Sequence, residues 1–132
     1  MGKLTAYDIA QLGEELARRA GELRTLVSRE AALGAATDYA ERAGTTVTDI
    51  ADEASADVLN DTEHVMHSHH LTELAEIEAA RQRIANADYG YCNTCGDAID
   101  ARRLRANPTA MRCLSCQTRH EREAGAGAPH RL

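Results

Sequence analysis

The 132-residue sequence is poor in large aromatic side chains: it has four tyrosines, no phenylalanine and no tryptophan. Aromatic rings supply much of the buried area of a thick globular core, so we do not expect such a core here. No apolar run approaches the roughly 20 residues that a membrane-spanning helix needs, and the start, Met1-Gly2-Lys3-Leu4, has no signal-peptide pattern. We therefore predict a cytoplasmic protein with no membrane partner.

Motifs for catalysis are also missing. The sequence has no glycine-rich phosphate loop and no nucleophile elbow. Its paired acids are not accompanied by the aromatic platform that a glycosidase site would need. We therefore predict that the protein is not an enzyme.

The apolar residues that are present are mainly alanine and leucine, accompanied by many glutamates and arginines. This composition is typical of long helices packed side by side. Charge is distributed unevenly: residues 1–87 carry 8 basic and 16 acidic side chains, a sum of −8, whereas residues 88–123 carry 6 basic and 5 acidic ones, a sum of +1. Because the acidic part would be repelled by a phosphate backbone, we predict no direct sequence-specific DNA binding.

The first long helix is predicted to begin at a capping box formed by Thr5 and Asp8. Seam positions then follow at alternating spacings of three and four, and six of the eight are apolar, which is typical of a helix packed on a partner helix. Gly44 stands where a C-cap would end this helix. The seam positions are Ile9, Leu12, Leu16, Arg19, Leu23, Leu26, Glu30 and Leu33.

A second helix is predicted from about Asp49 to Ala87, after the turn at residues 44–48. Its seam is poorer, because Glu63, His70 and Glu73 interrupt the apolar positions. Two long helices of matched length joined by a short turn form an antiparallel hairpin. We therefore predict an all-α fold with three parts: a coiled-coil hairpin at residues 1–87 with its tip near 44–54, a four-cysteine zinc-finger domain at 88–123 that ends in a short helix, and a disordered tail at 124–132.

The four cysteines form two CxxC pairs, Cys92/Cys95 and Cys113/Cys116. Each pair can point two thiolates at one ion, and two pairs complete a closed tetrahedral site for one structural Zn²⁺. Arginines around the pairs, including the proposed finger surface Arg102, Arg103 and Arg105, can offset the negative charge of four thiolates. A disulfide pair or a redox CxxC is the less favoured interpretation, given a reducing compartment.

Four histidines crowd one stretch of the second helix: His64, His67, His69 and His70. Two pairs of them are three residues apart and could share a metal or respond to pH. A solvated helix face with His70 at the seam is the more common arrangement and the one that we favour.

The finger sequence resembles the DksA/TraR zinc-finger family. The resemblance lies in the run Tyr89-Gly90-Tyr91-Cys92-Asn93-Thr94-Cys95-Gly96, followed by Ile99, Arg102-Arg103-Leu104, Pro108-Thr109-Ala110 and the second CxxC pair. It implies a transcription regulator that binds RNA polymerase, as core or holoenzyme, by entering its secondary channel with the hairpin first.

Members of this family carry an acidic element, D-x-x-D-x-A, at the hairpin tip. Its counterpart here is Asp49-Ile50-Ala51-Asp52-Glu53-Ala54. The resemblance implies that Asp49 and Asp52 are the functional acids and that Ala54 belongs to the tip surface. The same acids suit simple helix capping, since an N-cap aspartate and first-turn acids stabilise a helix start.

The best-known branch of the family holds guanosine tetraphosphate (ppGpp) between factor and polymerase with basic side chains. At positions of that kind this sequence has mostly neutral or acidic residues, namely His69, Glu76, Asn107 and Gln117, although Arg103 remains. Because cations pair with phosphate, we predict little dependence on ppGpp.

Two other functions remain open from the sequence. The finger could be a zinc-ribbon nucleic-acid-binding module that uses its arginine cluster, or the cysteines could form a redox thiol pair. We also predict a monomer, although the imperfect second seam leaves self-association open.

Overall fold

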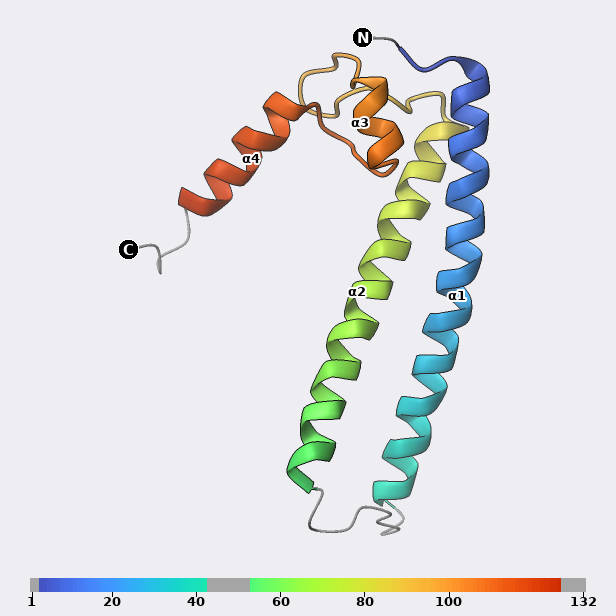
Figure 1. Ribbon diagram of the computed structural model, residues 1–132, viewed down its shortest axis with the longest axis vertical. Coiled ribbons are helices and arrows are strands. Elements are labelled where there is room, and N and C mark those ends of the chain that lie inside the picture. The colour runs from blue at the N-terminus through green and yellow to red at the C-terminus, as the bar shows by residue number, and fades with distance from the viewer. Residues whose placement is uncertain (1–2, 43–52, 127–132) are drawn as a thin grey trace. The chain divides into compact units, whose positions relative to one another are not determined.

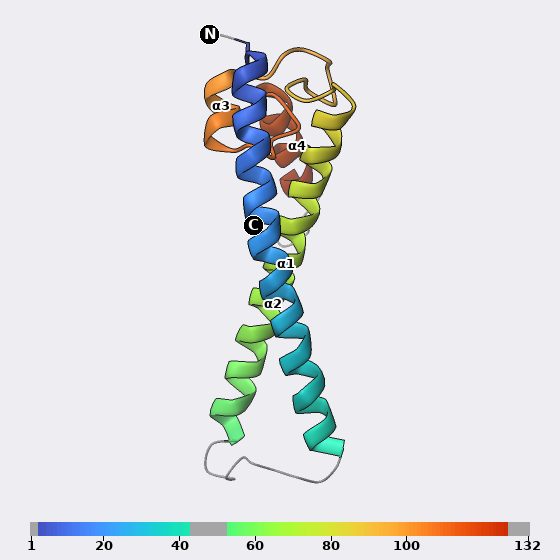
Figure 2. The same cartoon turned by 90° about the vertical axis from the view of Figure 1, so that its right-hand side faces the viewer.

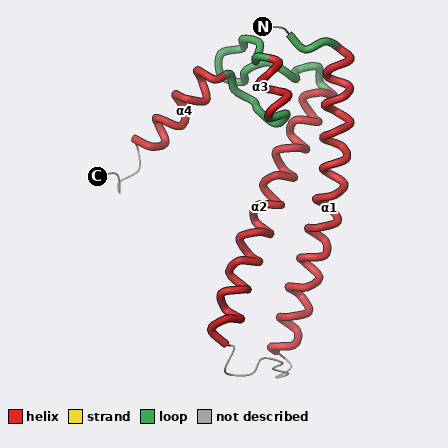
Figure 3. The backbone as a smooth tube through the Cα atoms, viewed as in Figure 1, coloured by secondary structure: helices red, strands yellow, loops and turns green. Residues whose placement is uncertain are grey.

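The computed structural model describes the backbone of residues 3–42 and 53–126, and the side chains of residues 3–36 and 61–125. Four helices occupy these residues: α1 (Ala6–Arg42), α2 (Glu53–Ala85), α3 (Ala101–Ala106) and α4 (Leu114–Ala126). The described part of the chain contains no strand, only an isolated antiparallel bridge between Tyr91 and Ala98 (Figure 3). The predicted fold class, helical with a small cysteine finger and a short C-terminal helix, is confirmed. None of the described helices is both long and apolar enough to cross a membrane.

Helix α1 begins at the predicted capping box. The Thr5 backbone N–H donates to the Asp8 carboxylate at 3.0 Å, and the Asp8 N–H donates to the Thr5 hydroxyl at 3.1 Å. These reciprocal bonds satisfy two N–H groups that a helix start would otherwise leave unpaired. The same bonds from Thr5 lower the pKa of Asp8 below its ordinary value.

Helix α2 ends in a left-handed turn. Ala87 has a φ of 62°, its N–H donates to the Ile84 carbonyl, and the Asp88 N–H donates to the Arg83 carbonyl at 2.8 Å. This pair of bonds is a Schellman motif, which usually places glycine at the left-handed position. The turn redirects the chain out of α2 and into the cysteine-bearing loops (Figure 1).

The chain divides into two compact units: residues 1–17 with 77–132, and residues 18–76. The last turns of α2 and the first turns of α1 belong to the same compact unit as the cysteine-bearing loops. We call residues 1–17 and 77–132 the finger unit and residues 18–76 the hairpin unit. In each unit, a stretch of α1 lies antiparallel to a stretch of α2 (Figures 1 and 2).

The finger unit has a buried apolar core. It combines leucines of α1 with residues from the end of α2, the loops and α3, and it includes two of the cysteines. The Tyr89 ring is buried, and its hydroxyl donates to the Pro108 carbonyl at 2.7 Å. The members of this core are Leu12, Leu16, Ile77, Ala80, Tyr89, Cys92, Ile99, Ala101, Leu104, Ala110 and Cys116.

The hairpin unit is held differently. Among its described side chains only Ala20 and Leu23 are buried apolar residues. Leu33, which the sequence places at the seam of the first helix, is 66% exposed, and Met66, an apolar residue of the second helix, is 49% exposed. Among the described side chains, no apolar residue of α1 beyond Leu23 is fully buried, although Leu26 and Val27 are half-buried. Further along, Glu30 contacts His67 and His70 of α2.

The predicted tip lies largely outside the described residues. Asp49 and Asp52 are not described, and Ala54 is described only as backbone within α2. At the other end, α4 continues to Ala126, so three residues that we had assigned to the tail are helical. Residues 127–132 lie outside the described part.

Candidate zinc centre

The first cysteine pair lies on a tight turn closed by the Tyr91–Ala98 bridge. The Cys92 N–H donates to the Asp97 carbonyl at 2.8 Å, and the Gly96 N–H donates to the Cys92 carbonyl at 3.0 Å. Gly96 has a φ of +80°, a conformation that residues with a β-carbon rarely adopt. The glycine after the second cysteine is therefore needed to bend this turn around the metal position.

The second cysteine pair lies at the start of α4. Cys113 immediately precedes the helix and Cys116 lies in its first turn, where the Gln117 N–H donates to the Cys113 carbonyl at 2.9 Å. The two pairs are tied together by the Asn93 N–H, which donates to the Met111 carbonyl at 2.8 Å. A loop turn and a helix start thus hold two sulfurs each on facing segments.

The four sulfur atoms lie within 4.8 Å of one another, and Cys95 Sγ and Cys113 Sγ are 3.8 Å apart. Four ligands about 2.3 Å from one zinc ion in a tetrahedron would stand about 3.8 Å apart. Within the described residues this is the one group of three or more histidine, cysteine or acidic side chains placed to share an ion. The residues fit one structural zinc ion.

The thiols also need a cation on electrostatic grounds. Burial disfavours a thiolate at Cys92, but N–H groups of Cys95 and Thr94 donate to its sulfur, and its pKa is lowered to about 5. At Cys95 a hydrogen bond from the Asp97 N–H lowers the pKa. The contacts with the neighbouring sulfurs outweigh it and raise the pKa to about 12. Four thiolates so close together repel one another, and a bound divalent cation would stabilise all four in the deprotonated form.

Arginines around the centre have distinct partners. Arg119 donates to Cys116 Sγ at 3.5 Å, which places a positive charge beside a ligand. Of the predicted finger surface, Arg102 is exposed, with 80% of its side chain accessible. Arg103 donates to the Arg112 carbonyl at 3.1 Å, and Arg105 contacts the Asp8 carboxylate at 3.4 Å.

Two contacts that sequence reasoning missed attach the finger to the long helices: the Arg105–Asp8 pair, and the Arg83 guanidinium, which donates to the Thr109 carbonyl at 3.3 Å. A third, between the Tyr89 hydroxyl and the Pro108 carbonyl, lies within the finger loops. Asp100 caps α3 by accepting from the Arg102 N–H at 2.8 Å, and this short helix buries Leu104. The sequence shows the Pro108-Thr109 pair, but it does not show that Tyr89 and Arg83 donate hydrogen bonds to the carbonyls of these two residues.

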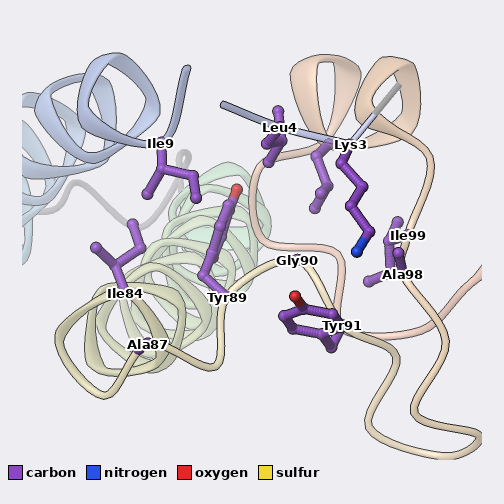
Figure 4. Close-up of a pocket in the computed structure, with 11 residues that line it drawn as sticks. Lys3, Leu4, Ile9, Ile84, Ala87, Tyr89, Gly90, Tyr91, Ala98 and Ile99 are labelled. Carbon is purple, nitrogen blue, oxygen red and sulfur yellow. The ribbon is translucent and has the colours of Figure 1, made fainter. Parts of the chain in front are cut away.

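A cavity of about 200 Å³ lies beside the finger, where the N-terminal segment meets the end of α2 and the loops (Figure 4). Its wall is mainly apolar, and Lys3 is the one charged side chain that lines it. It contains no pair of groups suited to acid–base or nucleophilic chemistry. The lining residues are Lys3, Leu4, Ile9, Ile84, Ala87, Tyr89, Gly90, Tyr91, Ala98, Ile99 and Leu104.

A closed four-cysteine centre packed on the ends of two antiparallel helices defines a zinc-finger protein whose metal is structural. Residues 87–122 match the family described as the prokaryotic dksA/traR C4-type zinc finger. The finger segment is therefore similar to the zinc finger of the DksA/TraR family, and the resemblance seen in the sequence is confirmed for these residues.

The curated relatives that the chain matches are proteins named DksA. The chain is 44% identical over 45 residues to the RNA polymerase-binding transcription factor DksA of Haemophilus influenzae, a match that covers 34% of this chain and 31% of that protein. It is 35% identical over 74 residues to the protein of the same name from Caulobacter vibrioides, covering 56% of this chain and 52% of that one. The matched stretch thus spans about a third to a half of the length of these relatives.

The structural similarity covers more of the chain than the sequence matches do. The structure of transcription factor DksA2 from Pseudomonas aeruginosa superimposes with a TM-score of 0.71 at 28% identity, covering 90% of this chain and 87% of that one. The helical arrangement outside the finger is therefore also similar to that of a DksA protein.

Proposed function

We propose that this protein is a transcription regulator that binds RNA polymerase. The observation that carries the proposal is the joint match of the finger sequence and of the fold over most of the chain to proteins named for this activity. The relatives are named as transcription factors, which supports a role without catalysis. A monomer in the cytoplasm without sequence-specific DNA contacts completes the proposal.

The proposed route is the secondary channel, entered by the hairpin with Asp49, Asp52 and Ala54 foremost. Support comes from α2, which is described without a break from Glu53 to Ala85, immediately after Asp52. Its 33 residues correspond to about 50 Å at 1.5 Å per residue. Along the chain, Asp52 directly precedes a helix of this length.

The proposed effect has little dependence on ppGpp. His69 and Glu76 are exposed on α2 and provide no permanent positive charge there. Gln117 is engaged with Glu121 at 2.7 Å, and the Arg103 guanidinium already binds a backbone carbonyl. These observations support the proposal that few cationic side chains at these positions are available to pair with the phosphates of ppGpp.

Reconstituted transcription tests the proposal. The wild-type protein should change the output of sensitive promoters, and Asp52→Asn should bind core polymerase with unchanged affinity while losing most of the effect. Asp61→Asn is the matched control, because Asp61 is an exposed acid of α2. Absence of binding to polymerase by the wild-type protein would refute the proposal, and an equal loss in both variants would refute the special role of the tip. Strong synergy with ppGpp would refute the proposed independence.

The zinc-ribbon alternative receives less support. Of the three arginines assigned to the finger surface, Arg103 and Arg105 have partners within the protein, and Arg102 faces Asp100 at 3.9 Å. Salt-dependent binding of duplex DNA by the full chain would restore this alternative.

A further inference from the structure

The cavity beside the finger is built by five separate segments of the finger unit. The N-terminal segment, α1, the end of α2, the finger loops and α3 together line about 200 Å³ of space (Figure 4). All of these segments belong to one compact unit, so the tertiary fold rather than a single helix surface forms the space. None of the four cysteines lines it. We call this space the finger cavity.

The finger cavity is apolar inside and polar at its mouth. Tyr89, Ile99 and Leu104 form the inner wall, with 4%, 3% and 0% of their surface exposed. Lys3 and Tyr91 are exposed and therefore lie at the mouth. The Tyr89 hydroxyl already donates to a backbone carbonyl, so this residue offers an apolar ring rather than a free donor. A molecule that fits the cavity therefore has an apolar body and a polar head.

The charge at the mouth determines the sign of that head. Lys3 is the one charged side chain that lines the cavity, and it is the only lysine of the sequence. It extends from the N-terminal segment toward the loop that carries Tyr91 and Ala98 (Figure 4). An ammonium group is a compact charge with three donors. Because a single ammonium balances one negative charge, the mouth suits a carboxylate better than a doubly charged phosphate.

The volume limits the size of the apolar body. An apolar cavity of about 150 Å³ binds a benzene molecule. The finger cavity, with about 200 Å³, therefore has room for roughly six carbon atoms and part of a head group. A longer alkyl chain would extend out of the mouth into water.

We propose that the finger cavity binds a small apolar monocarboxylate. Its hydrocarbon part lies against Tyr89, Ile99 and Leu104, and its carboxylate accepts hydrogen bonds from the Lys3 ammonium and the Tyr91 hydroxyl. The site lies within the finger unit and needs neither polymerase nor the hairpin tip. The proposal thus goes beyond the proposed function, and the two can fail separately.

Hexanoate is the probe, and the zinc-loaded full chain is the protein to test. Because Lys3 is the only lysine, protein made with ¹³C-labelled lysine gives a single side-chain ε-CH₂ signal in NMR spectra, and this signal reports on the mouth. Hexanoate should shift it saturably, with a Kd on the order of 1 mM or below. Isotope-filtered spectra should show NOEs from the hexanoate chain to Ile99 and Leu104. No saturation by about 10 mM, or no NOE to either residue, would overturn the proposal.

The length of the probe tests the apolar interior. Burial of one methylene group strengthens binding about fourfold. The Kd should therefore fall roughly tenfold from butanoate to hexanoate, and it should change little from hexanoate to octanoate, because the cavity is then full. A Kd that is the same for butanoate and hexanoate would contradict an apolar interior. An equal further fall with octanoate would contradict a cavity of this size.

Variants at the mouth test the role of the charge, with binding followed at the Ile99 methyl signals. Lys3→Gln should weaken hexanoate binding about two- to fivefold and leave the binding of hexan-1-ol unchanged, whereas Lys3→Arg should retain hexanoate binding. Lys3 is exposed, so neither exchange disturbs the core.

Arg102→Gln is the matched control, because it removes an exposed cation of the same unit that does not line the cavity. It should leave the Kd of hexanoate unchanged. Equal weakening by Lys3→Gln and Arg102→Gln would reduce the effect to net charge and contradict the role of Lys3. Binding of hexan-1-ol by the wild-type protein as tight as that of hexanoate would contradict the preference for a carboxylate.

Discussion

The finger unit and the hairpin unit are stabilised by different forces. Of the thirteen buried apolar residues among the described side chains, eleven belong to the finger unit, which also contains the four clustered cysteines. The described hairpin unit has Ala20 and Leu23 as its buried apolar residues. Across its helices lie the Arg19–Glu73 ion pair and the contacts of Glu30 with His67 and His70. Apolar burial is nearly insensitive to salt, whereas half-exposed ion pairs are screened by it. The two units should therefore respond differently to metal, mutation, salt and pH.

Removal of zinc should have the largest effect, and it should be confined to the finger unit. Binding of a structural zinc ion contributes on the order of 10 kcal/mol to the folding of small zinc domains. We expect Cys113→Ser, or treatment with a strong chelator, to abolish the hydrogen-exchange protection of residues 88–123. Ser115→Ala, in the same CxxC turn, is the control and should keep protection. If residues 18–36 lost protection equally, the two units would not be separable.

A core truncation should come second. Leu104→Ala removes a fully buried side chain of the finger unit and should lower the free energy of unfolding by about 2–5 kcal/mol. Leu33→Ala is the matched change in the hairpin unit, where the side chain is mostly exposed, and should change it by less than about 0.5 kcal/mol. Chemical denaturation of the zinc-loaded protein measures both, and equal effects would contradict the difference in packing.

The ion pair between Arg19 and Glu73 should give a smaller, condition-dependent effect. Arg19 lowers the pKa of Glu73 by hydrogen bonding, so the stabilisation is present above the unfolded carboxyl pKa and is lost as the pH falls through the folded one. Both side chains are 40% exposed, and solvent screening limits the contribution to about 1 kcal/mol or less. Glu73→Gln should lower the melting temperature at neutral pH and low salt, with the difference vanishing in high salt or acid. A difference that persists in high salt would point to packing instead.

The smallest expected effects come from two glycine exchanges, one in each unit. Ala87→Gly relieves the strain of an alanine in the left-handed conformation at the end of α2. Gly21→Ala replaces a flexible residue in the middle of α1, where a β-carbon would meet nothing within 4 Å. Each should raise the free energy of unfolding by about 0.5–1 kcal/mol. Thermal unfolding of the two variants and of their combination measures this. Destabilisation by Ala87→Gly would show that the Ala87 methyl group contributes more by packing than the left-handed conformation costs, and destabilisation by Gly21→Ala would show that the added methyl group meets a neighbour.

Local rules made much of this architecture predictable. The capping box at Thr5 and Asp8 and the two CxxC pairs depend on residues close together in sequence, and the structure shows both. The seam was predicted less well, because hydrophobic spacing marks Leu33 as a seam position but cannot show where the two helices stop packing. Glu30 and His70 were recognised as polar seam positions, yet their pairing depends on the register between the helices. The acids Asp49 and Asp52 stay a prediction.

The order of the two units along the chain has a further consequence. Residues 18–76 are inserted between the two segments that build the finger unit. The finger unit can therefore form only after a loop of about sixty residues has closed, a step whose entropic cost grows slowly with loop length. Equal numbers of residues could then be added to or removed from both helices within that insertion without altering a single contact around the metal. The length of the inserted segment can therefore change without a change in the residues that build the finger unit.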